Sequence, residues 1–335
     1  MSTDRLLRSD TRTAPRSSLI ENDPARSRAE LERALAEVPA YEAWRAFDPG
    51  PAASLDERYA ALPATDKQLM LARAPRGFVP RTADLDAALA SGAAELVRTS
   101  GTTGPPVTLV WNQAWWDQSE RAATPLHAAI AEAAATSERQ AVVASPRCVG
   151  PGERELAMRE RTLGRLLFPN ERADVARWSD DDVRRMAREL VAYAPALIEG
   201  EPAYLAALCA RAEALALELP RPRVVTLSYT WPSRLERARI ARAFRAPVAS
   251  AYGSTETGTV LIECERGRMH HNAASCRLEV AALPGRADLA RLLVTPLGHP
   301  FACYLRFDVG DLVRLAGAPC PCGRPGGAIA RVEGR

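Results

Sequence analysis

The chain has 335 residues, of which 47% are hydrophobic and 25% charged, which is enough for one large domain or two ordinary ones. Its 44 basic and 41 acidic side chains leave a net charge of +3, so composition indicates neither a nucleic-acid-binding face nor an acidic tail. No apolar run is long enough for a membrane-spanning helix, and the polar N-terminus lacks the apolar segment of a secretory signal. Seven cysteines, an odd number, do not suit a disulfide scaffold, and we expect a cytoplasmic protein.

Residues 1–94 are predicted to form a polar tail followed by a helical segment. The first 25 residues show no hydrophobic periodicity. Beyond them, apolar residues recur at three- and four-residue spacing, which predicts helices over 26–38, 53–63, 65–74 and 82–92.

Residues 95–262 change character, because short apolar runs now alternate with longer helical patterns. The runs at 95–100, 107–111, 141–145, 196–200, 223–228 and 246–253 are strand-like, and helical patterns cover 113–135, 181–193, 202–218 and 233–244. This alternation predicts an α/β fold with a layered, mainly parallel sheet and flanking helices.

Residues 263–335 are predicted to form a smaller, β-rich subdomain. Helical patterns stop after Gly258, and strand-like runs follow at 259–265, 276–283, 290–297, 303–311 and 328–335.

Three polar motifs interrupt these elements. The first is Arg98-Thr-Ser-Gly-Thr-Thr-Gly-Pro-Pro106, between two predicted strands. Its glycines permit tight turns, and its hydroxyls and backbone N–H groups can converge on phosphate oxygens. No Gly-Lys-Ser/Thr follows, so it is not a Walker loop. Taken alone, it also fits a polar hairpin turn.

The second motif is Ala251-Tyr-Gly-Ser-Thr-Glu-Thr-Gly258, at the end of a predicted strand. The carboxyl ends of strands are where α/β folds bind nucleotides. Tyr252 could stack on a base, and Glu256 could hold a divalent cation that bridges phosphates. A plain turn with a solvated glutamate is the alternative.

The third motif is Tyr304-Leu-Arg-Phe-Asp-Val-Gly-Asp-Leu312, followed by Arg331-Val-Glu-Gly-Arg335. An aspartate beside a glycine at a strand end suits paired hydrogen bonds to ribose hydroxyls, and an arginine suits phosphate or ribose oxygens.

Taken in order, these motifs resemble those of the adenylate-forming superfamily of acyl-CoA synthetases and adenylation domains. Thr99–Pro106 matches the family's phosphate loop, Tyr252–Glu256 its Tyr-Gly-x-Thr-Glu, and Gly310–Leu312 its Gly-Asp-Leu. Gly334 and Arg335 match the Gly-Arg of its interdomain hinge. The chain is most similar to phenylacetate–CoA ligases, which implies the large N-terminal domain of such an enzyme, with residues 95–262 as its nucleotide-binding core.

The resemblance implies a role for each matched residue. Those that would hold the ATP phosphates or shape their loop are Ser100, Gly101, Thr102, Thr103 and Gly104. Tyr252 would flank the adenine, Gly253 beside it would belong to the nucleotide-binding residues, Thr255 would touch the α-phosphate, and Glu256 would bind Mg²⁺. Asp311 would take the ribose hydroxyls, and Arg335 would reach the ribose or phosphate. The implied reaction is the activation of a carboxylic acid, expected to be aromatic, to acyl-AMP.

Two departures from the family pattern affect this interpretation. Where relatives have Gly-Ala-Glu or Gly-Gly-Glu beside the acyl and adenine sites, this chain has Leu227-Ser-Tyr-Thr-Trp-Pro232, and we expect Tyr229 to narrow the pocket. The family's C-terminal lid domain would follow Arg335, so we expect it to be absent here or supplied by a separate protein. Lys67, the only lysine, is a poor substitute for the catalytic lysine of that domain.

A possible zinc site lies in the β-rich subdomain. Cys264 and His270 are spaced C-x5-H, and Cys320-Pro-Cys322-Gly follows about fifty residues later. Three thiolates and one imidazole suit a closed, structural Zn²⁺ site, and some phenylacetate–CoA ligase relatives have a similar set. His271 is a reserve ligand. Cys148, Cys209, Cys276 and Cys303 are better explained as small buried residues.

Three functions remain open from the sequence. The first is a phenylacetate–CoA ligase-like enzyme that uses ATP, Mg²⁺ and CoA. The second is a standalone enzyme that loads an unusual acid onto a phosphopantetheinyl carrier protein. The third is a degenerate, nucleotide-binding relative without catalytic activity.

Overall fold

A computed structural model of the chain describes residues 20–99, 105–137, 139–145 and 156–334. These residues form two compact units. A terminal unit comprises residues 1–123, 253–261 and 268–335, and a central unit comprises 124–252 and 262–267. None of the described helices is both long and apolar enough to cross a membrane.

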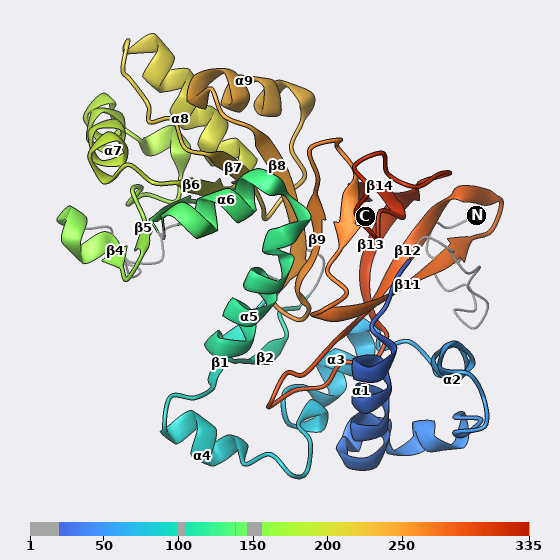
Figure 1. Cartoon of the computed structure of the whole chain (residues 1–335). Helices are drawn as coiled ribbons and strands as arrows, with labels where there is room; N and C mark the ends of the chain where they lie inside the picture. The colour runs from blue at the N-terminus through green and yellow to red at the C-terminus, as the bar shows by residue number, and fades with distance from the viewer. Residues whose placement is uncertain (1–19, 100–104, 138, 146–155, 335) are drawn as a thin grey trace. The chain divides into compact units, whose positions relative to one another are not determined.

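The terminal unit begins with short helices and continues into a small hairpin (Figure 1). The helices are α1 (Pro24–Glu37), α2 (Leu55–Ala61), α3 (Lys67–Arg73), α4 (Leu85–Ala90) and α5 (Gln113–Ala123), with 3-10 turns at Pro39–Ala46 and Arg76–Phe78. Asp23, Ser54, Asp66 and Asp84 cap the first four helices through side-chain oxygens. Strands β1 (Glu95–Arg98) and β2 (Thr108–Trp111) pair antiparallel.

The same unit ends in an antiparallel sheet. Its strands are β9 (Gly258–Glu263), β10 (Met269–His271), β11 (Cys276–Leu283), β12 (Arg286–Pro296), β13 (Phe307–Leu315) and β14 (Ile329–Gly334), in the spatial order β11-β12-β13-β14-β10-β9. This confirms the predicted β-rich region near the C-terminus. The strand expected over 303–311 begins only at Phe307, because buried Arg306 has a left-handed backbone, with φ of 48°.

The central unit is the α/β layer. Its helices are α6 (Ala128–Thr136), α7 (Asp180–Tyr193), α8 (Pro202–Ala214) and α9 (Arg234–Phe244), with 3-10 turns at Thr124–Leu126, Met158–Arg161 and Val175–Arg177. Its strands are β3 (Gln140–Val143), β4 (Thr162–Leu163), β5 (Leu166–Leu167), β6 (Leu197–Gly200), β7 (Val224–Leu227) and β8 (Val248–Ser254). They lie in the order β8-β7-β6-β3-β5-β4, and every neighbouring pair from β8 to β5 is parallel. The predicted mainly parallel sheet is therefore confirmed.

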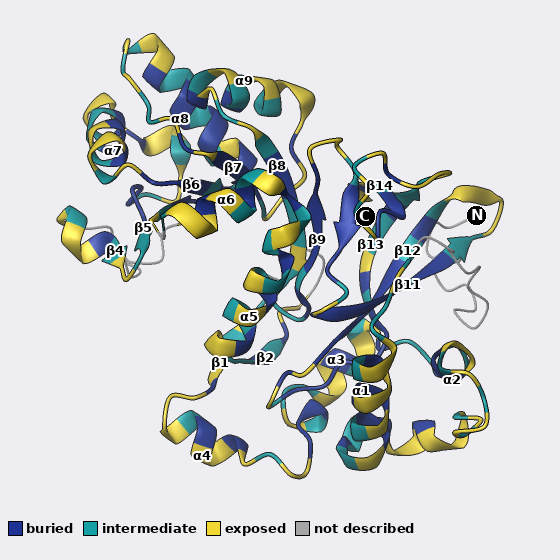
Figure 2. Ribbon diagram, viewed as in Figure 1, coloured by how far each residue is buried: buried dark blue, intermediate teal, exposed yellow. Residues whose placement is uncertain are grey.

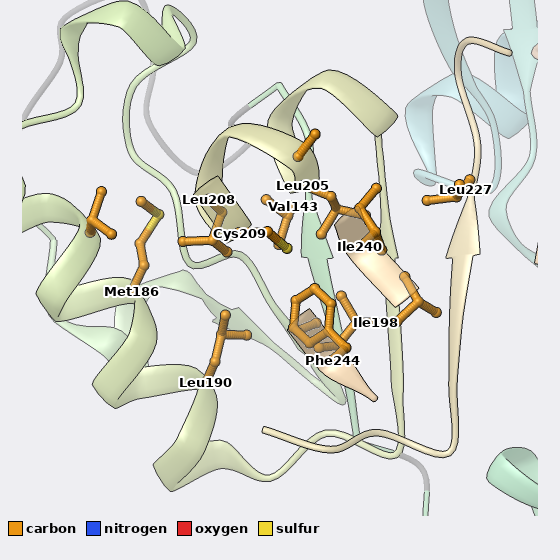
Figure 3. Close-up of a cluster of buried hydrophobic side chains, with 14 of the residues drawn as sticks. Val143, Met186, Leu190, Ile198, Leu205, Leu208, Cys209, Leu227, Ile240 and Phe244 are labelled. Atoms are coloured by element: carbon orange, nitrogen blue, oxygen red, sulfur yellow. The ribbon is translucent and has the colours of Figure 1, made fainter. Parts of the chain in front are cut away.

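Helices α7, α8 and α9 bury their apolar faces together against this parallel sheet (Figure 3). The cluster includes Met186 and Leu190 of α7, Leu208 and Cys209 of α8, Ile240 and Phe244 of α9, and Val143 and Ile198 of the strands. Their outer faces are largely exposed, which is the division expected of amphipathic helices (Figure 2).

One predicted helix is wrong in extent. The pattern over 113–135 predicts a continuous helix, whereas α5 ends at Ala123 and α6 begins at Ala128. Pro125 lies in the intervening 3-10 turn and has no N–H to donate within a helix. His127 then caps α6, because its side chain accepts a hydrogen bond from the N–H of Ala129.

Candidate nucleotide and metal sites

The hairpin of β1 and β2 flanks the predicted phosphate loop. Arg98 and Thr108 are register partners. The N–H of Thr99 donates to the Val107 carbonyl at 3.0 Å, and the N–H of Val107 donates to the Thr99 hydroxyl at 3.0 Å. The five residues assigned to the phosphates, from Ser100 to Gly104, lie outside the described residues.

The second motif forms the end of β8 and the turn into β9. Tyr252 and Gly253 lie in β8, whereas Thr255 and Glu256 lie in the turn and are partly buried. A Cβ on Gly253 would lie 2.1 Å from the carbonyl oxygen of Gly258, so a side chain there would collide with backbone. The glycine of the motif therefore permits the tight return of the chain that presents Glu256.

Hydrogen bonds within this turn fix its shape. The N–H of Thr257 donates to the Ser254 carbonyl at 3.1 Å, and the N–H of Ser254 donates to the Thr257 hydroxyl at 3.1 Å. The two hydroxyls lie 3.0 Å apart. The neighbouring Glu256 therefore projects from a turn whose backbone is held on both sides.

Tyr304, the first residue of the third motif, is electrostatically coupled to Glu256 of the second. Its side chain is buried, and burial together with the Glu256 carboxylate raises the pKa of its hydroxyl above the ordinary value. An electrostatic interaction therefore links the start of the third motif to the cation-binding candidate, which sequence spacing alone does not reveal.

Asp311 lies in a bulge within β13, not at a strand end as the sequence analysis expects. Leu293 pairs with Asp308 and Arg291 with Leu312, so three residues of β13 stand opposite one residue of β12. Such a bulge re-aims a side chain in the middle of a strand. Asp311 is partly exposed there.

Asp308, the other aspartate of this motif, has a structural position. Its side chain is only 7% exposed, pairs with Arg291 and accepts a hydrogen bond from the N–H of Gly310 at 3.0 Å. Burial raises the pKa of its carboxyl, and Arg291 opposes that rise. Gly310 has φ of 79°, a backbone conformation that favours glycine, so Asp308 and Gly310 together shape the bulge.

The last strand approaches the third motif. Gly334 ends β14 with φ of 87° and is the register partner of Leu312, the residue after Asp311. Arg335, the predicted ribose or phosphate ligand, lies outside the described residues.

The loop after β7 presents an exposed aromatic side chain. Tyr229 is 56% exposed and has a left-handed backbone, with φ of 71°. The N–H of Thr230 donates to the Ser228 carbonyl at 2.9 Å, and the Ser228 hydroxyl donates to Glu199 at 2.8 Å. Because β6 and β7 are parallel, this loop lies at their carboxyl ends, the edge at which α/β folds bind ligands.

Cys264, His270, Cys320 and Cys322 come together. Each offers one ligand atom, and these atoms all lie within 4.8 Å of one another. The first three residues are buried and Cys322 is partly buried. The Cys322 Sγ lies 3.3 Å from the His270 Nε2, and the His270 Nδ1 lies 2.7 Å from the Pro325 carbonyl oxygen. When the Pro325 carbonyl accepts a hydrogen bond from Nδ1–H, the unprotonated Nε2 is left directed at the sulfurs.

Both cysteine segments have the local geometry of metal knuckles. The Cys264 Sγ accepts the N–H of Arg266 at 3.4 Å, and the Cys322 Sγ accepts the N–H of Arg324 at 3.5 Å. A glycine with positive φ closes each segment. The N–H of Gly267 donates to the Cys264 carbonyl, and the N–H of Gly323 donates to the Cys320 carbonyl. Such N–H groups stabilise negative charge on thiolates, so the donor set and its surroundings fit a tetrahedral Zn²⁺ ion.

Gly327 packs directly against the cluster. A Cβ on Gly327 would lie 3.0 Å from the Cε1 of His270 and 3.1 Å from the Cβ of Cys320, so a side chain at that position would crowd two candidate ligands.

The remaining histidine and cysteines behave differently. His271 is not in the cluster, because its Nδ1 and Nε2 lie 3.0 and 2.9 Å from the carbonyl oxygens of Glu21 and Cys276. Cys209, Cys276 and Cys303 are buried, as predicted, and burial raises the pKa of each thiol. Cys148 lies outside the described residues.

No protein-family model and no curated protein sequence matches the chain. Solved structures do match. An open conformation of 2-hydroxyisobutyryl-CoA ligase, in complex with 2-HIB-AMP and CoA, superposes with a TM-score of 0.67 and 18% identity over 97% of this chain and 80% of that chain. The same ligase in its thioesterification state gives a TM-score of 0.64 at 18% identity, over 96% of this chain and 73% of that chain.

These identities are low, so the comparison concerns the fold. N-terminal helices, a mainly parallel sheet with flanking helices and an antiparallel β region occur in the same order as predicted. The described residues therefore have the fold seen in these 2-hydroxyisobutyryl-CoA ligase structures.

Proposed function

We propose that this protein activates a carboxylic acid with ATP to give an acyl-AMP and pyrophosphate. The observation that carries the proposal is that Glu256 of the Tyr-Gly-Ser-Thr-Glu motif and Tyr304 of the Tyr304–Leu312 motif interact electrostatically in a chain with the fold of an acyl-CoA ligase. The Asp311 bulge follows Tyr304 by seven residues.

The reaction requires positioning and charge neutralisation rather than a protein nucleophile. An oxygen of the substrate carboxylate attacks the α-phosphorus, a new P–O bond forms, and the bond from the α-phosphorus to the β-phosphate oxygen breaks. Pyrophosphate leaves with that electron pair. The chain's task is to hold MgATP and the acid in line.

Each proposed residue has one task. Glu256 binds the Mg²⁺ that accompanies the ATP phosphates, and Thr255 contacts the α-phosphate. Asp311 accepts hydrogen bonds from the ribose hydroxyls, and Tyr252 packs against the adenine. Residues 100–104 hold the phosphates, and Arg335 contacts the ribose or phosphate.

The acid is proposed to be aromatic, on a phenylacetate–CoA ligase-like pattern, with CoA or a carrier-protein thiol as acceptor. Tyr229, exposed at the carboxyl end of β7, is proposed to narrow the space for that acid.

A structural Zn²⁺ is proposed at the Cys264, His270, Cys320 and Cys322 cluster. Four protein ligands leave no open coordination position, so the metal would supply stability and no chemistry. It would hold the Cys320–Gly323 turn against the segment after β9.

The test is acid-dependent exchange of labelled pyrophosphate into ATP with a panel of aromatic and aliphatic acids. Exchange that needs one class of acid supports the proposal. Tight ATP binding without exchange, for every acid offered, would instead favour a nucleotide-binding protein without catalytic activity.

A further inference from the structure

Two buried side chains outside the nucleotide motifs hold the strand that follows Glu256. Ser119 on α5 is 1% exposed and Asn272, which follows β10, is 2% exposed. The N–H of Thr259 donates to the Ser119 hydroxyl at 2.9 Å. The Asn272 amide donates both to the Ser119 carbonyl, at 3.0 Å, and to the Thr259 carbonyl, at 2.9 Å. Both backbone groups of Thr259 are therefore fixed.

The contact between α5 and this strand is unusually close. Gly258 has φ of 67°, and a Cβ on it would lie 2.6 Å from the Ser119 hydroxyl oxygen and 3.1 Å from the Trp115 ring. Trp115 is itself anchored, because its Nε1 donates to the Leu297 carbonyl at 3.1 Å. Helix α5 can approach the turn this closely only because residue 258 is a glycine.

The same helix is directly connected to the predicted phosphate loop. β2 ends at Trp111 and α5 begins at Gln113, so a single residue separates the loop's second strand from the helix. Asn112 connects helix α5 to the segment just before β1. Its side chain accepts a hydrogen bond from the N–H of Trp115 at 2.8 Å and donates one to the Ala93 carbonyl at 2.7 Å. Helix α5 therefore follows directly from the hairpin that flanks the predicted phosphate loop. The middle of the same helix packs against Gly258 and Thr259, which follow the Glu256 turn.

We infer that Ser119 and Asn272 are positioning residues that set the spacing between the phosphate-binding hairpin and the Mg²⁺-binding turn. The inference rests on the proposed function, because it supposes that the hairpin and the turn bind the same MgATP. Ser119 and Asn272 would keep the two motifs aligned for that purpose. Neither side chain touches substrate. They act through the backbone of Gly258 and Thr259, two to three residues after Glu256.

The test uses Ser119→Ala, which removes the acceptor for Thr259, and Asn272→Asp, which keeps the shape but removes the amide donor. Ser119→Ala loses one buried hydrogen bond and Asn272→Asp loses two. We therefore expect Ser119→Ala to weaken MgATP binding about fivefold by calorimetry and to need about fivefold more Mg²⁺ for half-maximal exchange activity, and Asn272→Asp to show larger changes in the same direction. The KM for the acid should not change. Amide hydrogen exchange in the peptide over 254–260 should become faster.

Ser54→Ala is the matched control. Ser54 is the capping-box residue of α2, so its loss also destabilises the terminal unit, but it lies far along the chain from both motifs. It should lower the melting temperature without altering MgATP affinity or the Mg²⁺ requirement. A merely structural role for Ser119 would make its variant behave like Ser54→Ala.

The outcomes separate this inference from the proposed function. If wild-type protein binds MgATP but activates no acid, the proposed function is refuted. The positioning role can still be tested in that case, by comparing the MgATP affinities of wild type and the two variants. Unchanged MgATP affinity and unchanged exchange over 254–260 in both variants would overturn the positioning role, as would a wild-type protein that does not bind MgATP.

Discussion

Leu312 and Gly334 are register partners in the antiparallel pair of β13 and β14. Leu312 follows Asp311, and Gly334 precedes Arg335 in the sequence. Asp311 and Arg335, the two residues proposed to contact the ribose, are more than twenty positions apart in the sequence. Each is the sequence neighbour of one member of this register pair. This pairing of their sequence neighbours supports our proposal that both belong to one site.

Asp311→Ala should weaken ATP binding by roughly 2–4 kcal/mol, because two partly charge-assisted hydrogen bonds to the ribose hydroxyls are lost. The measurement compares the affinities for ATP and 2′,3′-dideoxy-ATP. Wild type should prefer ATP, and the variant should bind both alike.

Asp288→Ala is the control for that variant, because Asp288 is an exposed aspartate of β12 whose partners are Arg286 and Arg314. It should retain the wild-type preference for ATP. Equal discrimination by wild type and Asp311→Ala would reject the ribose assignment.

The sequence predicts the element types well, because hydrophobic periodicity and capping residues are local properties. It fails in part for local reasons: Pro125 interrupts a periodic pattern and splits one predicted helix, and the short strands β4, β5 and β10 carry too few residues for a periodic signal. It also fails where tertiary contacts decide, as where buried Arg306 delays β13. The Asp311 bulge and the Ser119–Thr259 contact depend on strand register and helix approach, which no motif encodes. The cysteine–histidine grouping is predicted correctly, because its residue types are chemically distinctive.

Glu256→Gln should weaken ATP binding in the presence of Mg²⁺ and have little effect without it, because one cation-facing charge is lost while the side-chain shape is kept. Calorimetry with and without Mg²⁺ measures this difference. Glu213→Gln, at a surface pair with Arg242, is the control and should match wild type in both conditions. A Mg²⁺-dependent affinity that survives Glu256→Gln would show that the cation is held elsewhere.

Cys322→Ser should lower both zinc content and melting temperature, because metal binding and folding of the Cys320–Gly323 turn are coupled. Elemental analysis of wild type should give about one Zn²⁺ per chain, as expected for one set of four ligands. That knuckle lies between Asp311 and Gly334 in the sequence, so nucleotide binding should weaken as well.

Cys209→Ser provides the control for zinc content. Cys209 is buried among the apolar side chains of α8 and lies outside the cluster, so its substitution should cost stability but leave the metal in place. A folded wild-type protein without zinc, or zinc that persists in Cys320→Ser and Cys322→Ser, would refute the metal site.

Stability should fall as the pH drops below about 6.5, the ordinary pKa of histidine. Burial, with a smaller contribution from Arg33, lowers the pKa of His299 to about 3, and its Nδ1 accepts the N–H of Phe301 at 3.1 Å. The unfolded chain therefore binds a proton between pH 6.5 and 3 that the folded chain does not, which costs up to about 1.4 kcal/mol per pH unit.

Denaturant unfolding at pH 7.5 and 5.5 measures this dependence. His299→Asn keeps a side-chain acceptor but does not titrate, so its unfolding free energy should fall less between the two pH values. His271, whose pKa burial lowers to about 4, leaves a residual dependence of the same sign. Identical pH dependence in wild type and His299→Asn would contradict the assignment.

The most direct test of the central claim follows an oxygen atom. If a carboxylate oxygen attacks the α-phosphorus of ATP, an acid labelled with ¹⁸O in its carboxylate must leave one ¹⁸O in the AMP once the acyl group passes to a thiol or to water. Mass spectrometry of the nucleotide product should therefore show singly labelled AMP together with pyrophosphate, in amounts that depend on the acid. Unlabelled AMP, or ADP and phosphate as the products, would contradict acyl adenylation by this protein.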